Sequence, residues 1–198
     1  MNRIRRFLKS VLPLLLAVLL LCTCGGGTVQ SEAESAEGGN LAEFIGDEAF
    51  SKLQGVDKLT LTIYYMNVNV DTMIPVYTED LIAVAYECKA VVKGGRLRKH
   101  MDLLEQINNA VLVPMPAEEA ARYGEGRYGF ARMYFVFETR DGNKLFDVVS
   151  GGEKIMFINE IAIDANPIFY DIFLQFLPVD AAEELQTYLA KVLKSLHQ

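Results

Sequence analysis

The chain has 198 residues, of which 51% are hydrophobic, and its 26 acidic side chains outnumber its 19 Lys and Arg, for a formal net charge of −7. This length and apolar content suit one domain with a sizeable core. The acidic balance disfavours nucleic acid as a partner, and also direct adhesion of the domain to anionic lipid, because both present phosphates that attract basic surfaces.

The N-terminal segment has the layout of a secretory signal, in which a cationic start precedes an apolar run. Residues 11–22 form this run, which is shorter than the about 20 apolar residues of a membrane-spanning helix. We therefore expect residues 1–23 to be a cleaved signal peptide. Its charged residues are Arg3, Arg5, Arg6 and Lys9, so the chain without it has a net charge of −11.

The apolar run ends in Leu21-Cys22-Thr23-Cys24, which resembles the lipobox of bacterial lipoproteins. The resemblance implies that Cys24 receives a diacylglyceryl group and becomes the first residue of the mature chain. Cys22 fits less well, because Leu21 would then occupy the position where the family has a small residue. Since two acyl chains give a stable anchor, the resemblance implies a membrane-bound protein on the extracytoplasmic face of the cell membrane.

The residues that follow Cys24 are predicted to form a flexible tether, up to about residue 45. Residues 25–40 contain Gly, Ser, Glu and Gln with almost nothing to bury, a composition typical of disorder. A flexible segment of about 16 residues reaches on the order of 20–25 Å. Past Cys24 the only thiol is Cys88, so no internal disulfide is expected, and residues 46–198 are predicted to be a single domain.

The first half of this domain mixes strand and helix patterns. A period of two predicts strands from Lys58 and over residues 82–92, although Thr78 could begin a helical turn ahead of the second one. Residues 96–109 change to apolar spacings of three and four, which predict an amphipathic helix. Residues 110–115 are a short apolar stretch with proline, typical of an edge strand.

The second half begins with the strongest local signal, a hairpin over residues 130–149. Asp141-Gly142 lies between two alternating runs and favours a two-residue type I′ turn. The predicted cross-strand pairs are Phe137 with Phe146 and Phe135 with Val148. Two further short strands precede a pair of C-terminal helices, which begin near Asn166 and Asp180. The predicted fold class is α+β, a mostly antiparallel sheet packed on one face by helices.

The span from about residue 58 to 189 is similar in order and texture to a group of small, uncharacterised bacterial lipoproteins. The segments that carry this resemblance are KLTLTIYYMN, HMDLLEQINN, YFVFETRDGNKLFDVV and NPIFYDIFLQFLP. The resemblance implies no known activity, substrate or site.

No residue constellation in the sequence predicts a catalytic, cofactor-binding or metal-binding site. His100 is interpreted as structural, Cys88 as a buried, inert thiol and Ser150 as part of a turn. Arg and Tyr are typical of interfaces, and four of them recur in one loop as a candidate interaction surface, although an ordinary solvated loop is the favoured interpretation. They are Arg122, Tyr123, Arg127 and Tyr128.

These observations lead to one functional hypothesis and two alternatives. We expect a lipid-anchored cell-envelope domain that binds a protein, peptide or glycan without catalysis. The first alternative is an envelope hydrolase that uses surface carboxylates, and it requires Glu138, Asp147 and Glu153 to converge in a pocket. The second is a small-ligand carrier, which requires an apolar cavity under the sheet that the many Phe side chains are expected to fill.

Overall fold

A computed structural model describes residues 37–123, 131–150 and 154–195 of the chain, with side chains up to residue 191. The chain divides into two units, Met1–Ser35 and Ala36–Gln198, and every described residue belongs to the second. The signal peptide, Cys24, Arg127, Tyr128 and Glu153 therefore lie outside the described residues.

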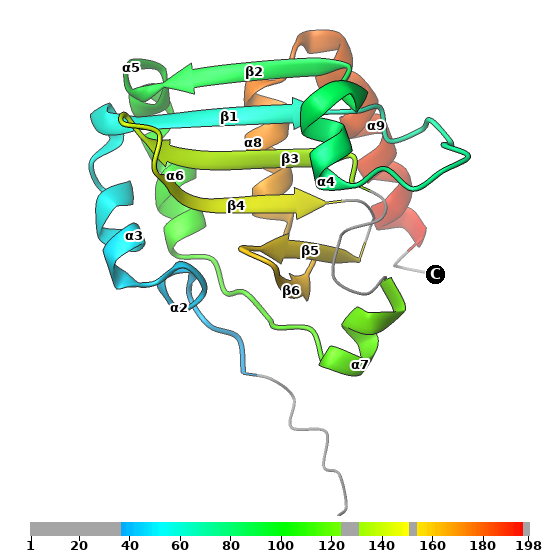
Figure 1. The fold of residues 1–198 in the computed structure, drawn as a ribbon, viewed down its shortest axis with the longest axis horizontal. Helices are drawn as coiled ribbons and strands as arrows, with labels where there is room; N and C mark the ends of the chain where they lie inside the picture. The colour runs from blue at the N-terminus through cyan, green and yellow to red at the C-terminus, as the bar shows by residue number, and fades with distance from the viewer. Residues whose placement is uncertain (1–36, 124–130, 151–153, 196–198) are drawn as a thin grey trace, which may run out of the picture. The chain divides into compact units, whose positions relative to one another are not determined.

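The centre of the fold is a six-stranded sheet in the order β2-β1-β3-β4-β5-β6, in which all neighbouring strands are antiparallel (Figure 1). This arrangement confirms the predicted α+β class. The strands are β1 (Leu59–Tyr65), β2 (Cys88–Lys93), β3 (Met133–Thr139), β4 (Lys144–Ser150), β5 (Ile155–Ile158) and β6 (Ile161–Asp164).

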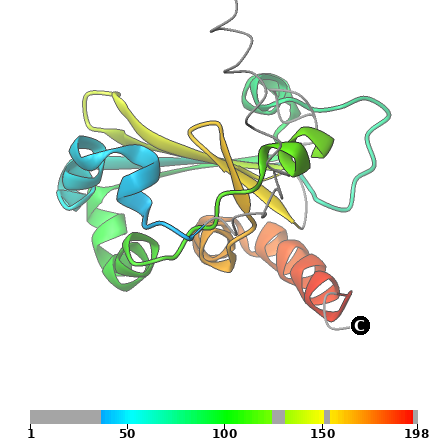
Figure 2. The same ribbon diagram turned by 90° about the horizontal axis from the view of Figure 1, so that it is seen from below.

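One face of this sheet is packed by helices, most of which lie on the same side in Figure 2. The main core combines apolar side chains from the sheet with buried residues of these helices, such as Phe169 and Phe173 of α8. The predicted helix over 96–109 is realised as three short consecutive pieces. The helices on this core are α2 (Leu41–Ile45), α3 (Asp47–Leu53), η1 (Val56–Lys58), α5 (Gly94–Leu97), α6 (Met101–Asn108), α8 (Pro167–Phe176) and α9 (Val179–Ser195), and η3 (Arg98–His100) connects α5 to α6.

The packed body begins ahead of the predicted boundary at residue 46. Asn40 caps α2 through a side-chain oxygen that accepts from the Ala42 N–H, and Leu41 is completely buried in the main core. Gly39 forms a β-bridge with Leu112. Residues 39–45 therefore belong to the folded body and not to a tether.

The hairpin of β3 and β4 has the predicted pairs but not the predicted turn. The pairs Phe137 with Phe146 and Phe135 with Val148 are confirmed, whereas the turn at Asp141-Gly142 is not type I′, because only its glycine has a positive φ, +81°. The Gly142 N–H donates to the Thr139 carbonyl, which gives a three-residue loop. The register then shifts by one residue between Phe137 and Glu138, which restores the predicted pairs.

The predicted strand over residues 82–92 is wrong in its first half. Residues 78–80 form the α4 turn, Leu81–Ala85 continue as a π-helical turn, and β2 begins only at Cys88. The Asp80 carboxylate accepts from the Tyr77 N–H and so caps this turn, whose Leu81 is fully buried. The alternative prediction, a helical turn that begins near Thr78, is therefore confirmed for residues 78–85.

The remaining described segments cover one edge of the sheet. Within residues 110–115, Pro114 forms a β-bridge with Ile163 of β6, and the Met115 N–H donates to the Ala162 carbonyl. The predicted edge strand is thus reduced to isolated bridges. The short α7 (Ala117–Ala120) and η4 (Ala121–Tyr123) follow it. No helix in the described part of the chain has the length and apolar character to cross a membrane.

Candidate functional site

The candidate site lies on the sheet face opposite the helices, here named the open face. Alternation along the strands turns the apolar side chains of β1 toward the main core and turns Thr60, Thr62 and Tyr64 to the other side. One end of the open face is covered by a second, smaller apolar cluster that includes Val76 and Leu81. Tyr64 and Tyr134 are also members of this cluster. The polar side chains of the face come from β1, β3 and β4, together with Lys89 of β2.

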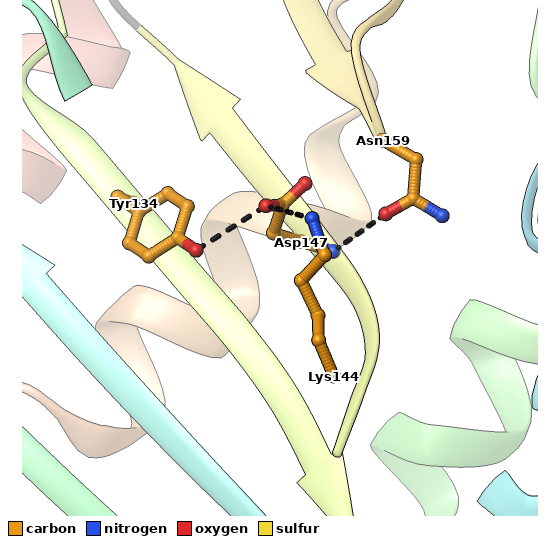
Figure 3. A network of polar contacts seen from close by, with 4 residues as sticks. All are labelled: Tyr134, Lys144, Asp147 and Asn159. Carbon is orange, nitrogen blue, oxygen red and sulfur yellow. Dashed lines mark hydrogen bonds and ion pairs between the residues drawn. The ribbon is translucent and has the colours of Figure 1, made fainter. Parts of the chain in front are cut away.

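A hydrogen-bonded network centred on Asp147 crosses this face (Figure 3). The Tyr134 hydroxyl lies 3.2 Å from Asp147 Oδ2, and Lys144 Nζ lies 2.9 Å from the same oxygen. The Asp147 backbone N–H donates to Asn159 Oδ1 at 3.2 Å, and the Asn159 N–H donates to the Asp147 carbonyl. Two strands and a turn therefore fix the position of one carboxylate.

In this network the Tyr134 hydroxyl acts as a hydrogen-bond donor. Its side chain is buried, and burial together with the charge of Asp147 raises the pKa of the phenol well above its usual range. The hydroxyl stays protonated at neutral pH and donates to Asp147. A tyrosine held in this state is a positioning group and not a base or nucleophile.

An aromatic row continues the network toward β2. The ring of Tyr64 lies 5.9 Å from that of Tyr134 and 5.4 Å from that of Tyr86, the latter edge to face. Lys89 Nζ lies 4.7 Å from the centre of the Tyr64 ring, and the interaction with Tyr64 raises the pKa of this ammonium. The row places one cation and one half-exposed aromatic ring at the β2 end of the open face.

The structure brings two of the three predicted carboxylates onto this face. Asp147 is paired with Val136 and Lys144 with Glu138 across the β3–β4 ladder, so Glu138 and Asp147 are diagonal neighbours on one face. Lys144 lies beside both and forms its ion pair with Asp147. Glu153, the third carboxylate, is outside the described residues.

The predicted interaction surface is described only in its first two residues. Arg122 is exposed and Tyr123 is half-buried in η4, while Arg127 and Tyr128 fall between two described ranges. The open face is a different surface from η4. The sequence analysis did not single out Tyr64, Lys89 and Asn159 as residues of a candidate site. Their signal was the alternation of polar residues on the outer side of each strand, which does not tell which strands are neighbours.

Three residues with reactive side chains have structural surroundings. The ring of His100 packs edge to face on Phe176 at 5.0 Å, and the Ser150 hydroxyl is buried 3.4 Å from the Tyr170 hydroxyl. Cys88 is half-buried, and burial raises the pKa of its thiol, which lowers its reactivity. The packing of His100 agrees with its interpretation as a structural residue, and Cys88 is less buried than predicted. The prediction that Ser150 belongs to a turn is wrong, because Ser150 is the last residue of β4 and pairs with Met156 of β5.

A shallow groove of about 390 Å³ lies away from the network, lined by residues 54–58, Arg98 and Met101. An ion pair between Arg98 and Asp57 is part of its wall. Across the described ranges, no group of three or more His, Cys, Asp or Glu side chains is arranged to hold a metal ion. The groove brings together neither a carboxylate pair nor a nucleophile with a base, so the open face remains the stronger candidate.

Comparison with known proteins gives no functional assignment, so any functional conclusion rests on the features described above. No family model matches the chain, and neither a curated protein nor a solved structure matches it.

Proposed function

We propose that the protein is a lipid-anchored cell-envelope domain that binds a protein, peptide or glycan on its open face without catalysing a reaction. The observation that supports binding is the row from Tyr86 through Tyr64 and Tyr134 to Asp147 and Lys144, which crosses the neighbouring strands β1, β3 and β4 with fixed geometry. Tyr64 and Tyr134 are buried and hold the row in place, whereas Tyr86 and Lys144 at its two ends are exposed to a ligand. Groups held on a rigid sheet bind without the entropy cost of ordering them.

The charge of the open face supports a ligand with carboxylate or hydroxyl groups. Lys89, Lys93 and Lys144 lie on this side of the sheet, although the chain without its signal has a net charge of −11. Glu138 and Asp147 add hydrogen-bond acceptors to the same face. A mixed set of this kind selects a ligand by the pattern of its polar groups more than by its net charge.

The binding proposal is tested with the soluble body, residues 36–198, on a peptide library and on an array of envelope polysaccharide fragments. For any ligand that binds, Lys89→Glu and Lys144→Glu should each weaken affinity at least about tenfold, the effect of losing about 1.4 kcal/mol. Lys191→Glu on α9 is the matched control and should leave affinity unchanged. Equal affinity in all three variants would place binding elsewhere.

The lipid anchor is tested in cells with single cysteine variants. Cys24→Ala should release the protein from membranes or block its processing, because it removes the acyl acceptor, whereas Cys22→Ala should leave the protein attached. The measurement is the distribution between membrane and soluble fractions. A correctly processed Cys24→Ala protein that stays on the membrane contradicts the anchor.

The alternative of an envelope hydrolase is favoured by one observation, the diagonal placement of Glu138 and Asp147 on one face. Two nearby carboxylates can act as acid and base or nucleophile in glycoside hydrolysis. The same polysaccharide fragments serve as substrates. Product release that is abolished by both Glu138→Gln and Asp147→Asn would replace the binding proposal by this alternative.

A further inference from the structure

The segment between β1 and α4, residues 66–77, projects from the body as a loop (Figures 1 and 2). Met73 is fully exposed and Ile74 is 73% exposed, and Val70 is also exposed nearby. A single exposed apolar residue needs no explanation, but two adjacent large ones within a projecting loop do. Met73 and Ile74 are here named the tip.

The loop is held in place on both sides of the tip. The Arg132 guanidinium is buried and donates to the Val70 carbonyl at 3.3 Å and to the Thr72 hydroxyl at 3.0 Å. On the other side, the Ala131 N–H donates to the carbonyl of Val76, whose side chain is buried in the second apolar cluster. The tip is therefore fixed from both sides.

The tip is also restricted locally. Pro75 follows Ile74, and a residue before proline is confined to extended backbone. Its exposure is thus built into the fold and is not the result of a loose segment. A preformed apolar protrusion loses little conformational entropy when it enters another phase.

We infer that the tip dips into the lipid bilayer to which the chain is anchored; this inference rests on the lipid anchor proposed above. The chain between Cys24 and the described body has 12 residues, 25–36, and 12 residues span at most about 40 Å when fully extended. A body of about 160 residues has a radius of gyration of about 15 Å and thus a diameter of roughly 40 Å. The tether is therefore long enough for this loop to face the bilayer.

The lipid anchor also compensates for the low membrane affinity of only two apolar side chains. Two apolar residues partition only weakly into lipid by themselves, as a single acyl chain does. A tether that keeps the tip within tens of ångströms of the bilayer turns this weak step into an intramolecular one, at an effective concentration in the millimolar range. A convex tip suits a deformable lipid phase, which needs no matching pocket.

The charges around the tip indicate which lipid it enters. Asp71 lies two residues before the tip, and Glu79 and Asp80 lie in the turn that follows the loop, all of them exposed. These carboxylates stay in the aqueous headgroup region and limit the depth of insertion. They favour zwitterionic lipid, because an anionic surface repels them.

The test uses the full lipidated chain, purified from membranes and reconstituted into phosphatidylcholine vesicles. The chain has no Trp, so Ile74→Trp introduces a single reporter at the tip. Val179→Trp is the matched control, because Val179 is similarly exposed, 71%, at the start of α9. Flotation with the vesicles reports the anchor, and quenching of Trp by bromine-labelled phosphatidylcholine reports contact with the acyl chains.

We expect both variants to float and Ile74→Trp to be quenched several-fold more than Val179→Trp, with its emission shifted to shorter wavelength. Met73→Asp added to Ile74→Trp should remove this quenching, and replacing part of the lipid by phosphatidylglycerol should reduce it.

Equal quenching in two floating variants would overturn the inference and leave the anchor standing. An emission shift without quenching would also overturn it, since the tip would then contact protein. Failure to float would refute the anchor itself, and the inference with it.

Discussion

The β5–β6 turn offers a substitution that should stabilise the protein, Glu160→Gly. Asn159 and Glu160 connect the paired residues Ile158 and Ile161, and both have positive φ, +46° and +73°. This is the geometry of a type I′ turn, in which Asn is well accepted but Glu is not. The turn keeps Asn159 in place to accept the Asp147 N–H, so its backbone geometry supports the network of the open face.

The magnitude follows from two opposing backbone terms. A residue with a Cβ in the left-handed region costs about 1–2 kcal/mol, and Gly loses about 0.5–1 kcal/mol more conformational entropy on folding than Ala does. The difference predicts a gain of about 0.5–1 kcal/mol in the free energy of unfolding. For a body of this size the midpoint of thermal unfolding should rise by about 1–4 °C.

The assay is urea unfolding and thermal melting of the soluble body, with Gly142→Ala as a control of opposite sign. Gly142 has φ +81°, and a Cβ placed there meets no atom within 4 Å, so this change tests the backbone alone. It should destabilise by about 1 kcal/mol. A Glu160→Gly protein that is no more stable than the wild type would refute the assignment of strain to this turn.

Three other predictions concern the core and the open face. Leu41→Ala should destabilise the body by about 2–5 kcal/mol, because Leu41 is fully buried; a loss below about 1 kcal/mol in urea unfolding would return residues 39–45 to the tether. Tyr134→Phe should cost about 0.5–1.5 kcal/mol by removing the hydrogen bond to Asp147, and an unchanged urea midpoint would argue against the network. Burial raises the pKa of Tyr65 to about 12, above the usual value near 10, so the folded state keeps a proton that the unfolded state releases and stability should fall as pH rises from about 10 to 12. The wild type should lose more stability than Tyr65→Phe over that interval, and parallel curves would contradict the raised pKa.

The sequence predicts the central part of the sheet well because alternation and burial agree there. Phe135 and Phe137 are apolar on one face, and their partners on β4 are apolar on the same face, so only one register buries all of them. The turn type is less well determined, because it depends on the number of loop residues. An extra residue, Leu145, in β4 lets the loop at Asp141-Gly142 have three residues while the Phe pairs stay in place.

The candidate site depends on information that no local pattern contains. Tyr64 and Tyr134 are 70 positions apart and meet because β1 lies beside β3, with β2 displaced to the outside. Alternation assigns each to the outer face of its own strand but does not give the strand order. The prediction for the start of β2 is wrong for a similar reason, since the cluster in which Leu81 is buried includes Tyr64 of β1 and Tyr134 of β3, which are remote from it in sequence.

The two edges of the sheet are protected in different ways against pairing with another copy. The bridge at Pro114 and the hydrogen bond from Met115 occupy part of the outer side of β6, where proline also removes a donor. The other edge, β2, is six residues long, carries Lys89 and Lys93, and runs directly into α5. Lysine side chains on an edge strand disfavour strand addition. Copies crowded side by side in two dimensions would therefore repel one another at β2 and resist the edge-to-edge aggregation that such crowding promotes.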